Sequence, residues 1–223
     1  MGKILCVSAH PDDCEVGCSG YVRQLIEKGY RAYLVVVTNG ENGFKIDDLP
    51  VEERIAIRRK EQEEAAGLWG MEKIFYFGFR DGFLEYNEDL RRRLVEVIKM
   101  IRPQMIFTFD PANRLFDDLN LQHRDHRMVG EAVFDACFAA RNRWMYPGEA
   151  HSVEKICFFA SQTPNLEIDI TPYLQFKIDL LARHRSQFPD KNQLTKFVKQ
   201  KINPPEQGRH KERFRVISGQ RKI

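Results

Sequence analysis

Short apolar runs alternate along this chain with stretches of helical periodicity, and this alternation restricts the possible folds more than any other feature. The apolar runs predict buried strands at 3–8, 31–38, 72–78, 104–110 and 154–161. The periodic stretches predict helices at 15–28, 51–70, 87–103, 122–141 and 171–188. Regular alternation of strand and helix indicates right-handed β-α-β crossovers. We therefore expect a Rossmann-like, three-layer α/β fold, in which a mostly parallel sheet of five or more strands has helices on both faces.

The sequence predicts a single domain whose C-terminal segment is basic. Its 223 residues suffice for a single sizeable core, and no internal repeat divides them, so we expect one domain over 1–223. The whole chain carries a net charge of +3, but residues 191–223 alone carry +8. A basic segment can bind nucleic acid. Few aromatic residues accompany it, however, so we favour a solvated, partly ordered C-terminus and do not expect nucleic acid as a partner.

Cysteine content and hydropathy indicate the compartment. Five cysteines are present, none of them in a C-x-x-C pair, and they are Cys6, Cys14, Cys18, Cys137 and Cys157. Those in apolar patterns are expected to be reduced, buried thiols. No apolar run is long enough to cross a bilayer, and the first predicted strand begins too early to leave room for a signal peptide. We expect a cytoplasmic protein without a membrane partner.

Polar side chains follow the predicted strands, at the points where those strands end. They are His10, Asp12, Asp13, Thr38, Asn39, Arg80, Asp81 and Asp110. In doubly wound sheets, ligands bind beyond the carboxyl ends of the strands. The sequence therefore predicts a site at this edge of the sheet.

The turn after the first strand reads "AHPDDCEVG". A dinucleotide-binding protein would have G-x-G-x-x-G here, so that pyrophosphate could approach the backbone. Carboxylates repel a phosphate and attract a cation. The turn therefore favours a metal ion over NAD or FAD.

A second cluster, "HRDHR" at 123–127, opens a predicted helix. His123 and His126 are three residues apart, so they share a face of that helix. One histidine and one carboxylate from the first turn, with one histidine from this helix, would supply three ligands. Three nitrogen or oxygen ligands with an open position are typical of catalytic zinc, although other divalent ions are possible. The residues alone do not choose between Asp12 and Asp13 as the carboxylate ligand.

Each of these residues also has a purely structural interpretation. Asp12 and Asp13 could cap the helix that follows them. His10 could be satisfied by a backbone group, and His126 could lie on a solvated helix face. Both clusters in one doubly wound pattern are better explained together, by a metal site.

Together, "AHPDDCEVG" and "HRDHRMVG" resemble the LmbE/PIG-L family of zinc-dependent N-acetylglucosaminyl deacetylases. The resemblance extends over nearly the whole chain, through "TNGENG", "RRKEQEEAAGLWG" and "HRSQF", and is greatest to the archaeal diacetylchitobiose deacetylase type. The chain departs from the family at Arg124, where proline is usual, and at Ser19, where glycine is frequent. Both departures bear on substrate preference.

The resemblance implies a role for each residue. His10, Asp13 and His126 would be the zinc ligands, and Asp12 the general base. A protonated His123 would stabilise the oxyanion, oriented by Asp125. The side chains expected to bind substrate are Arg58, Arg80, Asp81 and His151.

The resemblance also implies the reaction and the assembly. The expected activity is hydrolysis of the N-acetyl group of a GlcNAc-containing small molecule or short oligosaccharide, such as diacetylchitobiose. An alternative is a sister amidase that acts on a glucosaminyl-malate-type thiol precursor or a glycosylated natural product. A homo-oligomer, trimer or hexamer, is expected. An alternative of another class is a non-catalytic binding protein with a nucleic-acid-binding basic tail.

Overall fold

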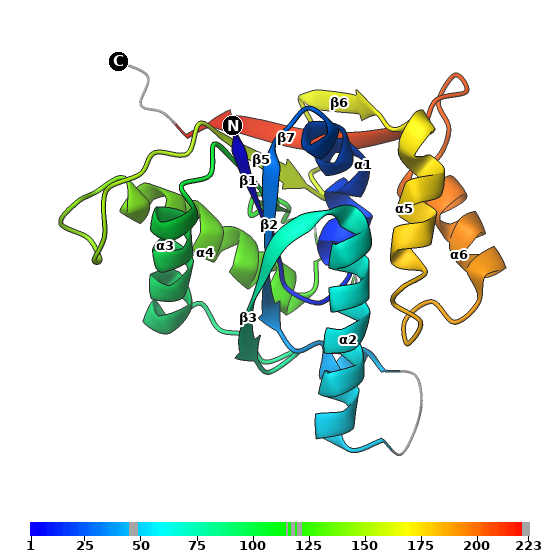
Figure 1. Ribbon diagram of the computed structural model, residues 1–223, viewed down its shortest axis with the longest axis horizontal. Coiled ribbons are helices and arrows are strands. Elements are labelled where there is room, and N and C mark those ends of the chain that lie inside the picture. Colours follow the sequence, from blue (N-terminus) through cyan, green and yellow to red (C-terminus); the bar gives the residue numbers. More distant parts are fainter. Residues whose placement is uncertain (45–48, 115, 117–118, 120–121, 220–223) are drawn as a thin grey trace.

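A seven-stranded sheet forms the centre of the computed structural model, with helices on both of its faces (Figure 1). The structure describes residues 1–44, 49–114, 116, 119 and 122–219. The spatial order of the strands is β3-β2-β1-β4-β5-β7-β6. Their bounds are β1 Lys3–Ser8, β2 Arg31–Thr38, β3 Met71–Phe79, β4 Met105–Phe109, β5 Lys155–Phe159, β6 Leu166–Asp169 and β7 Lys211–Ser218.

The first five strands run parallel, as the alternation predicts. β1 pairs with β2 and with β4, β2 pairs with β3, and β4 pairs with β5, all of them parallel. From Ile4 and Ala32 onward, β1 and β2 are buried, as expected of strands covered on both faces. The predicted α/β fold is confirmed.

Helices connect these strands and cover both faces of the sheet. Their bounds are α1 Asp13–Glu27, α2 Val51–Trp69, α3 Glu88–Ile101, α4 Arg124–Ala140, α5 Leu174–Leu181 and α6 Lys191–Phe197. α3 packs on α4 on one face, and α1 and α2 pack on α5 on the other (Figure 1). Short helical turns complete the chain: η1 Glu41–Gly43, η2 Thr171–Tyr173 and η3 Val198–Ile202. No helix among the described residues is long and apolar enough to cross a membrane.

The sequence prediction is wrong for the last third of the chain in two places. The helix expected over 171–188 consists of η2 and α5 only, and it ends at Leu181. The following turn is held instead by Glu61 on α2, whose carboxylate accepts hydrogen bonds from the backbone N–H and the hydroxyl of Ser186.

The second error concerns the basic segment. Rather than a solvated tail, it contains α6, η3 and β7, and β7 lies between β5 and β6, antiparallel to both. Several of its charges are paired within the fold. Arg215 contacts Asp110 at 2.6 Å, and Lys211 and Arg213 contact Glu167. A free basic tail, which motivated the nucleic-acid alternative, is therefore not what residues 191–219 form.

The cysteine prediction is confirmed. All five thiols are free and buried, and Cys6, Cys14 and Cys18 lie in the main hydrophobic core with Trp69 and Phe107.

Candidate active site

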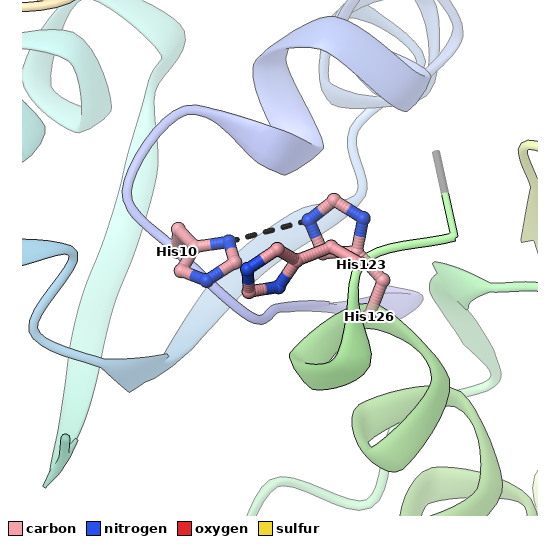
Figure 2. Close-up of side chains that lie close together, drawn as sticks. All are labelled: His10, His123 and His126. Carbon is pink, nitrogen blue, oxygen red and sulfur yellow. Dashed lines mark hydrogen bonds between the residues drawn. The ribbon is translucent and has the colours of Figure 1, made fainter. Parts of the chain in front are cut away.

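The carboxyl ends of β1 and β3 and the start of α4 bring the two sequence motifs together. His10 follows β1, Asp13 opens α1, and His123 and His126 lie at the start of α4. Figure 2 shows His10, His123 and His126 close together. The three histidines border a cavity of about 270 Å³. The lining residues are His10, Asp12, Gly40, Asn42, Gly43, Arg58, Asp81, Gly82, His123, His126 and Gln187.

Glycines in both motifs permit the close packing that places these side chains. A Cβ on Gly130 of α4 would lie 2.9 Å from the backbone oxygen of Phe109, at the end of β4. A Cβ on Gly17 of α1 would lie 2.6 Å from the ring of Phe159. Because α4 approaches β4 so closely, the ring of His126 stacks on Phe109 with centroids 4.0 Å apart.

Donor atoms of three residues converge at the motifs. His126 Nε2 lies 3.2 Å from His10 Nδ1 and 3.3 Å from Asp13 Oδ1, and His10 Nδ1 lies 3.4 Å from Asp13 Oδ2. Four tetrahedral ligands at about 2.0–2.1 Å from zinc would be separated from one another by roughly 3.3 Å. The spacing and the nitrogen-oxygen donor set therefore fit a zinc ion, with a fourth position left for water or substrate.

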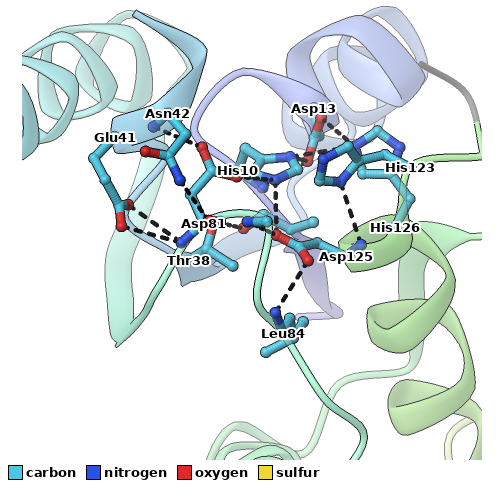
Figure 3. A network of polar contacts seen from close by, with 12 residues as sticks. His10, Asp13, Thr38, Glu41, Asn42, Asp81, Leu84, His123, Asp125 and His126 are labelled. Carbon is cyan, nitrogen blue, oxygen red and sulfur yellow. Dashed lines mark hydrogen bonds and ion pairs between the residues drawn. The ribbon is translucent and has the colours of Figure 1, made fainter. Parts of the chain in front are cut away.

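The other ring nitrogen of His10 is held by two carboxylates. His10 Nε2 lies 3.0 Å from Asp81 Oδ1 and 3.2 Å from Asp125 Oδ2 (Figure 3). An outer carboxylate of this kind fixes the tautomer of a ligating histidine. Burial lowers the pKa of His10, but Asp13, Asp125 and Asp81 together raise it well above its usual value.

Asp12 is separate from this donor set. Its carboxylate accepts from Arg58 Nη1 at 3.3 Å, and it borders the cavity. Burial raises its pKa, and the positive charge of Arg58 opposes that effect only in part. A carboxylate of raised pKa beside the donor set is suited to take up a proton.

His123 is held by a backbone group. As the N-cap of α4, its Nδ1 accepts from the backbone N–H of Asp125 at 3.2 Å, so its proton lies on Nε2. Burial and the neighbouring His10 lower its pKa. Both effects disfavour the protonated imidazole that the resemblance implies, and the role of His123 at the oxyanion stays a prediction.

Asp125 contacts different partners from those expected. Its carboxylate accepts from the backbone N–H of Gly82 at 2.7 Å and of Leu84 at 3.2 Å, besides the ring of His10. Only its backbone contacts His123. The carboxylate thus joins α4 to the loop after β3, and the expected carboxylate-imidazole pair with His123 is not formed.

Arg58 is buried against the general-base candidate. It is 2% exposed, and its Nη2 donates to the carbonyl oxygen of Pro11 at 2.6 Å as well as to Asp12. Its guanidinium borders the cavity, but most of its donors already serve this loop. Arg58 therefore supports the loop of Asp12, and binding of substrate by Arg58 stays a prediction.

Arg80 lies at the rim of the cavity, and Asp81 lies in its wall. Asp81 Oδ2 accepts from the backbone N–H of Asn42 at 2.9 Å, so this buried carboxylate braces two loops. Arg80 is exposed and lies over the ring of Phe83, 3.8 Å from its centroid. Arg124, the departure from the family pattern, donates to the carbonyl oxygen of Leu84 at 3.0 Å and thus supports the same rim loop.

The structure does not bring His151 or Asp110 to the site within one chain. His151 Nε2 donates at 2.7 Å to the carbonyl oxygen of Pro103. Pro103 precedes β4 and so lies at the amino ends of the parallel strands, opposite to the site. Asp110 lies at the expected edge but is paired with Arg215. The loop residues Asp117 and Asp118 lie outside the described residues.

Sequence reasoning missed the support behind Asp12. Gln62, Glu15 and His184 are all fully buried there. Two signals could have found them: Glu15 belongs to the first motif, and Gln62 lies one helical turn after Arg58.

The fold and the site define a class: an α/β protein whose cluster of histidines and carboxylates, beyond the carboxyl ends of its parallel strands, could hold a metal ion. Residues 5–137 match the family described as PIG-L, GlcNAc-PI de-N-acetylase. The chain belongs to this PIG-L (LmbE) family.

The chain is similar to several proteins that are named as deacetylases. The chain is 32% identical to the diacetylchitobiose deacetylase of Thermococcus kodakarensis, over 84% of its length and 71% of the relative's. The solved N,N'-diacetylchitobiose deacetylase of Pyrococcus horikoshii is 30% identical, with a TM-score of 0.83 over 97% of this chain and 84% of that one. A probable N-acetyl-alpha-D-glucosaminyl L-malate deacetylase of Bacillus anthracis is 26% identical over 84% of this chain and 82% of the relative.

Proposed function

We propose that this protein is a zinc-dependent deacetylase that hydrolyses the N-acetyl group of a GlcNAc-containing small molecule or short oligosaccharide. The observation that carries the proposal is the convergence of donor atoms of His10, Asp13 and His126, at 3.2–3.4 Å from one another, beside the separate carboxylate of Asp12. Membership of the PIG-L family supports the same reaction.

The proposed metal ligands and the proposed general base have separate roles. His10, Asp13 and His126 would hold the ion, which supplies Lewis-acid polarisation of the acetamide carbonyl when it is bound. Asp12 takes the proton of the attacking water and then delivers it to the departing amine. The raised pKa of Asp12 suits it to both steps.

His123 would stabilise the carbonyl oxygen of the substrate by a hydrogen bond. With Nδ1 occupied by a backbone N–H, the ring has its Nε2–H left to donate to the negative charge that develops on that oxygen.

The cavity supports a small sugar as substrate. Its volume of about 270 Å³ is near the lower limit of ligand pockets, which span roughly 300–1,000 Å³. We assign the acetamido sugar to this cavity, and the rest of the substrate to the rim formed by Arg80 and the loop that follows it. Asp81, as part of the wall, shapes the cavity.

Diacetylchitobiose is the substrate best supported, because both deacetylases of that type are at least 30% identical to this chain. The test is acetate release by the zinc-loaded protein from diacetylchitobiose, GlcNAc and N-acetylglucosaminyl-malate. Turnover of the disaccharide is expected to be the fastest. Preference for the malate conjugate would establish the alternative instead, and no acetate from any of them would refute the proposal.

We also propose a cytoplasmic homo-oligomer, trimer or hexamer. Support comes from the exposed aromatic side chains Phe134 and Phe138 on α4 and Trp144 just after it, which a second copy could cover. His151 would then reach a pocket only as part of a neighbouring subunit. Light scattering of the purified protein tests the assembly, and a monomer would refute it.

A further inference from the structure

Helix α2 holds both polar groups of the Pro11–Asp12 peptide. Arg58 Nη2 donates to the carbonyl oxygen of Pro11 at 2.6 Å. The backbone N–H of Asp12 donates to Gln62 Oε1 at 3.2 Å. Arg58 and Gln62 are four residues apart, so one turn of a single helix orients this peptide plane.

The conformation held in this way is a strained one. Asp12 has φ 99° and ψ −23°, in the left-handed region that non-glycine residues rarely occupy. Such a residue persists only where its surroundings enforce the conformation. This turn directs Asp13 toward His10 and His126 while the carboxylate of Asp12 remains with Arg58.

Gln62 is itself held from behind. Its Nε2 donates to Glu15 Oε1 at 2.6 Å, and that oxygen lies 3.4 Å from His184 Nε2. Gln62, Glu15 and His184 are each 0% exposed. A carboxylate only accepts and a backbone N–H only donates, so the amide of Gln62 has one orientation that satisfies both neighbours.

We infer that Gln62, supported by Glu15 and His184, is a positioning residue for the general base. Its amide oxygen holds the backbone of Asp12 in the left-handed conformation, and its amide nitrogen is anchored on Glu15. It touches neither the cavity nor the metal ligands and acts through Asp12. The inference rests on the proposed function for its kinetic effect, but not for its structural effect.

A simple packing role predicts different behaviour. If Gln62 only fills space, an apolar residue of similar size lowers stability without altering turnover by the folded fraction. If it positions Asp12, the same change lowers kcat and leaves KM and the bound metal nearly unchanged. Misplacement of a reacting group by about 1 Å can cost roughly 10²-fold in rate.

The experiment compares Gln62→Leu with wild type in the zinc-loaded protein, measuring kcat, KM, zinc content and melting temperature. Leu194→Ala is the matched control, because it removes a buried side chain on α6 without contact to the loop of Asp12. We expect kcat to fall by about 10²-fold for Gln62→Leu and to stay within twofold for the control. An unchanged kcat for Gln62→Leu overturns the inference.

A reciprocal exchange sharpens the test and covers a Gln62→Leu protein that does not fold. Gln62→Glu alone sets two carboxylates against each other and should be impaired. Combined with Glu15→Gln, it restores an amide-carboxylate hydrogen bond while the new carboxylate accepts from Asp12. Recovery of kcat to within several-fold of wild type is expected. A double variant no better than Gln62→Glu contradicts the assignment.

Crystal structures of the variants separate this inference from the proposed function. Gln62→Leu should show Asp12 with φ outside the left-handed region, and the reciprocal double variant should show it restored. If wild type releases no acetate from any acetylated glucosaminide, the proposed function fails and the structures alone decide. A left-handed Asp12 in Gln62→Leu then refutes the positioning role.

Discussion

Two clusters of buried charged side chains differ in how completely their polar atoms are paired. Between α5 and β7, Lys177 and Glu212 form an ion pair at 2.8 Å. The carboxylate of Glu212 also accepts from the backbone N–H of Gly20 at 2.9 Å and of Tyr21 at 2.8 Å. Around the candidate active site, two carboxylates share one ring nitrogen of His10.

The buried polar atoms that lack a hydrogen-bond partner separate the two clusters in the same way. Among the described residues, the buried atoms without a hydrogen-bond partner include Glu15 Oε2, Arg58 Nε and both ring nitrogens of His184, all behind the site. Atoms of Lys177 and Glu212 are absent from that set. Strain and incomplete pairing are tolerated where they serve chemistry, and complete pairing is typical of stabilising contacts. The comparison predicts that one cluster governs activity and the other governs stability.

The largest effect is expected at Asp12. Asp12→Asn removes the proton acceptor and should lower kcat by about 10²–10⁴-fold, because general-base catalysis contributes that much. The melting temperature should change little, because asparagine keeps a side-chain oxygen that accepts from Arg58 and also tolerates the left-handed conformation. Acetate release and thermal denaturation measure the two effects. An active variant would show that Asp12 is not the base.

At Lys177 we expect a loss of stability without a loss of activity. Lys177→Met leaves the charge of Glu212 buried without its ionic partner, which typically costs about 3–5 kcal/mol. Urea unfolding measures this loss, while kcat per folded molecule should not change. If kcat fell in parallel with stability, the two clusters would not be independent and the comparison would fail.

His123→Ala tests the oxyanion donor. Removal of one such donor costs about 10²–10³-fold in kcat. Because His123 is not among the three proposed ligands, zinc content measured by atomic emission should remain stoichiometric. Loss of zinc along with activity would instead place His123 in the ligand set.

A smaller effect is expected at Asp81. Asp81→Asn removes one of the two carboxylates on His10 Nε2, and Asp125 remains. Outer-shell changes of this kind cost about 10–100-fold in metal affinity, and we expect the lower end of that range. Competition with a zinc chelator measures it, and an affinity equal to that of wild type would exclude a role for Asp81 in holding His10.

The smallest effect concerns pH and the pair of Asp110 with Arg215. Burial raises the pKa of Asp110, but the hydrogen bonds from Arg215, Ser161 and the backbone N–H of Ala112, with the charge of Arg215, together outweigh burial and lower that pKa. A lowered folded-state pKa stabilises the fold above the unfolded value near 3.9, and this contribution is lost as pH falls through the folded value. Arg215→Met should remove about 1 kcal/mol or less at pH 7 and nothing in strong acid, as unfolding at several pH values will show. Equal losses at all pH values would contradict this.

The parallel half of the fold was predictable because each of its elements has a local signal. The buried strands β1 and β2 are continuous apolar runs, and Asn87 caps α3 as its type predicts, accepting from the backbone N–H of Leu90. β7 has a weaker signal. "KERFRVIS" is not a continuous apolar run, and its charged residues find their partners in distant parts of the sequence, among them Glu167 for Arg213 and Asp110 for Arg215.

The same limit applies to the site. Which residue types meet there followed from the two motifs, because the carboxyl ends of parallel strands meet at one edge. Which atoms they contact did not follow. Arg58 was expected to bind sugar and holds Pro11 and Asp12, and Asp125 was expected to pair with His123 and pairs with His10.

The sequence by itself thus determined the class of fold and the kinds of side chain at the site, because both depend on local periodicity and composition. Its residues left open how two adjacent aspartates divide their roles, and only the resemblance to a family separated them. The tertiary structure shows the physical reason. A left-handed turn at Asp12, held by Arg58 and Gln62 of a helix some fifty residues away in sequence, directs neighbouring carboxylates to different partners. A dihedral angle enforced from that distance has no signature in the residues that adopt it.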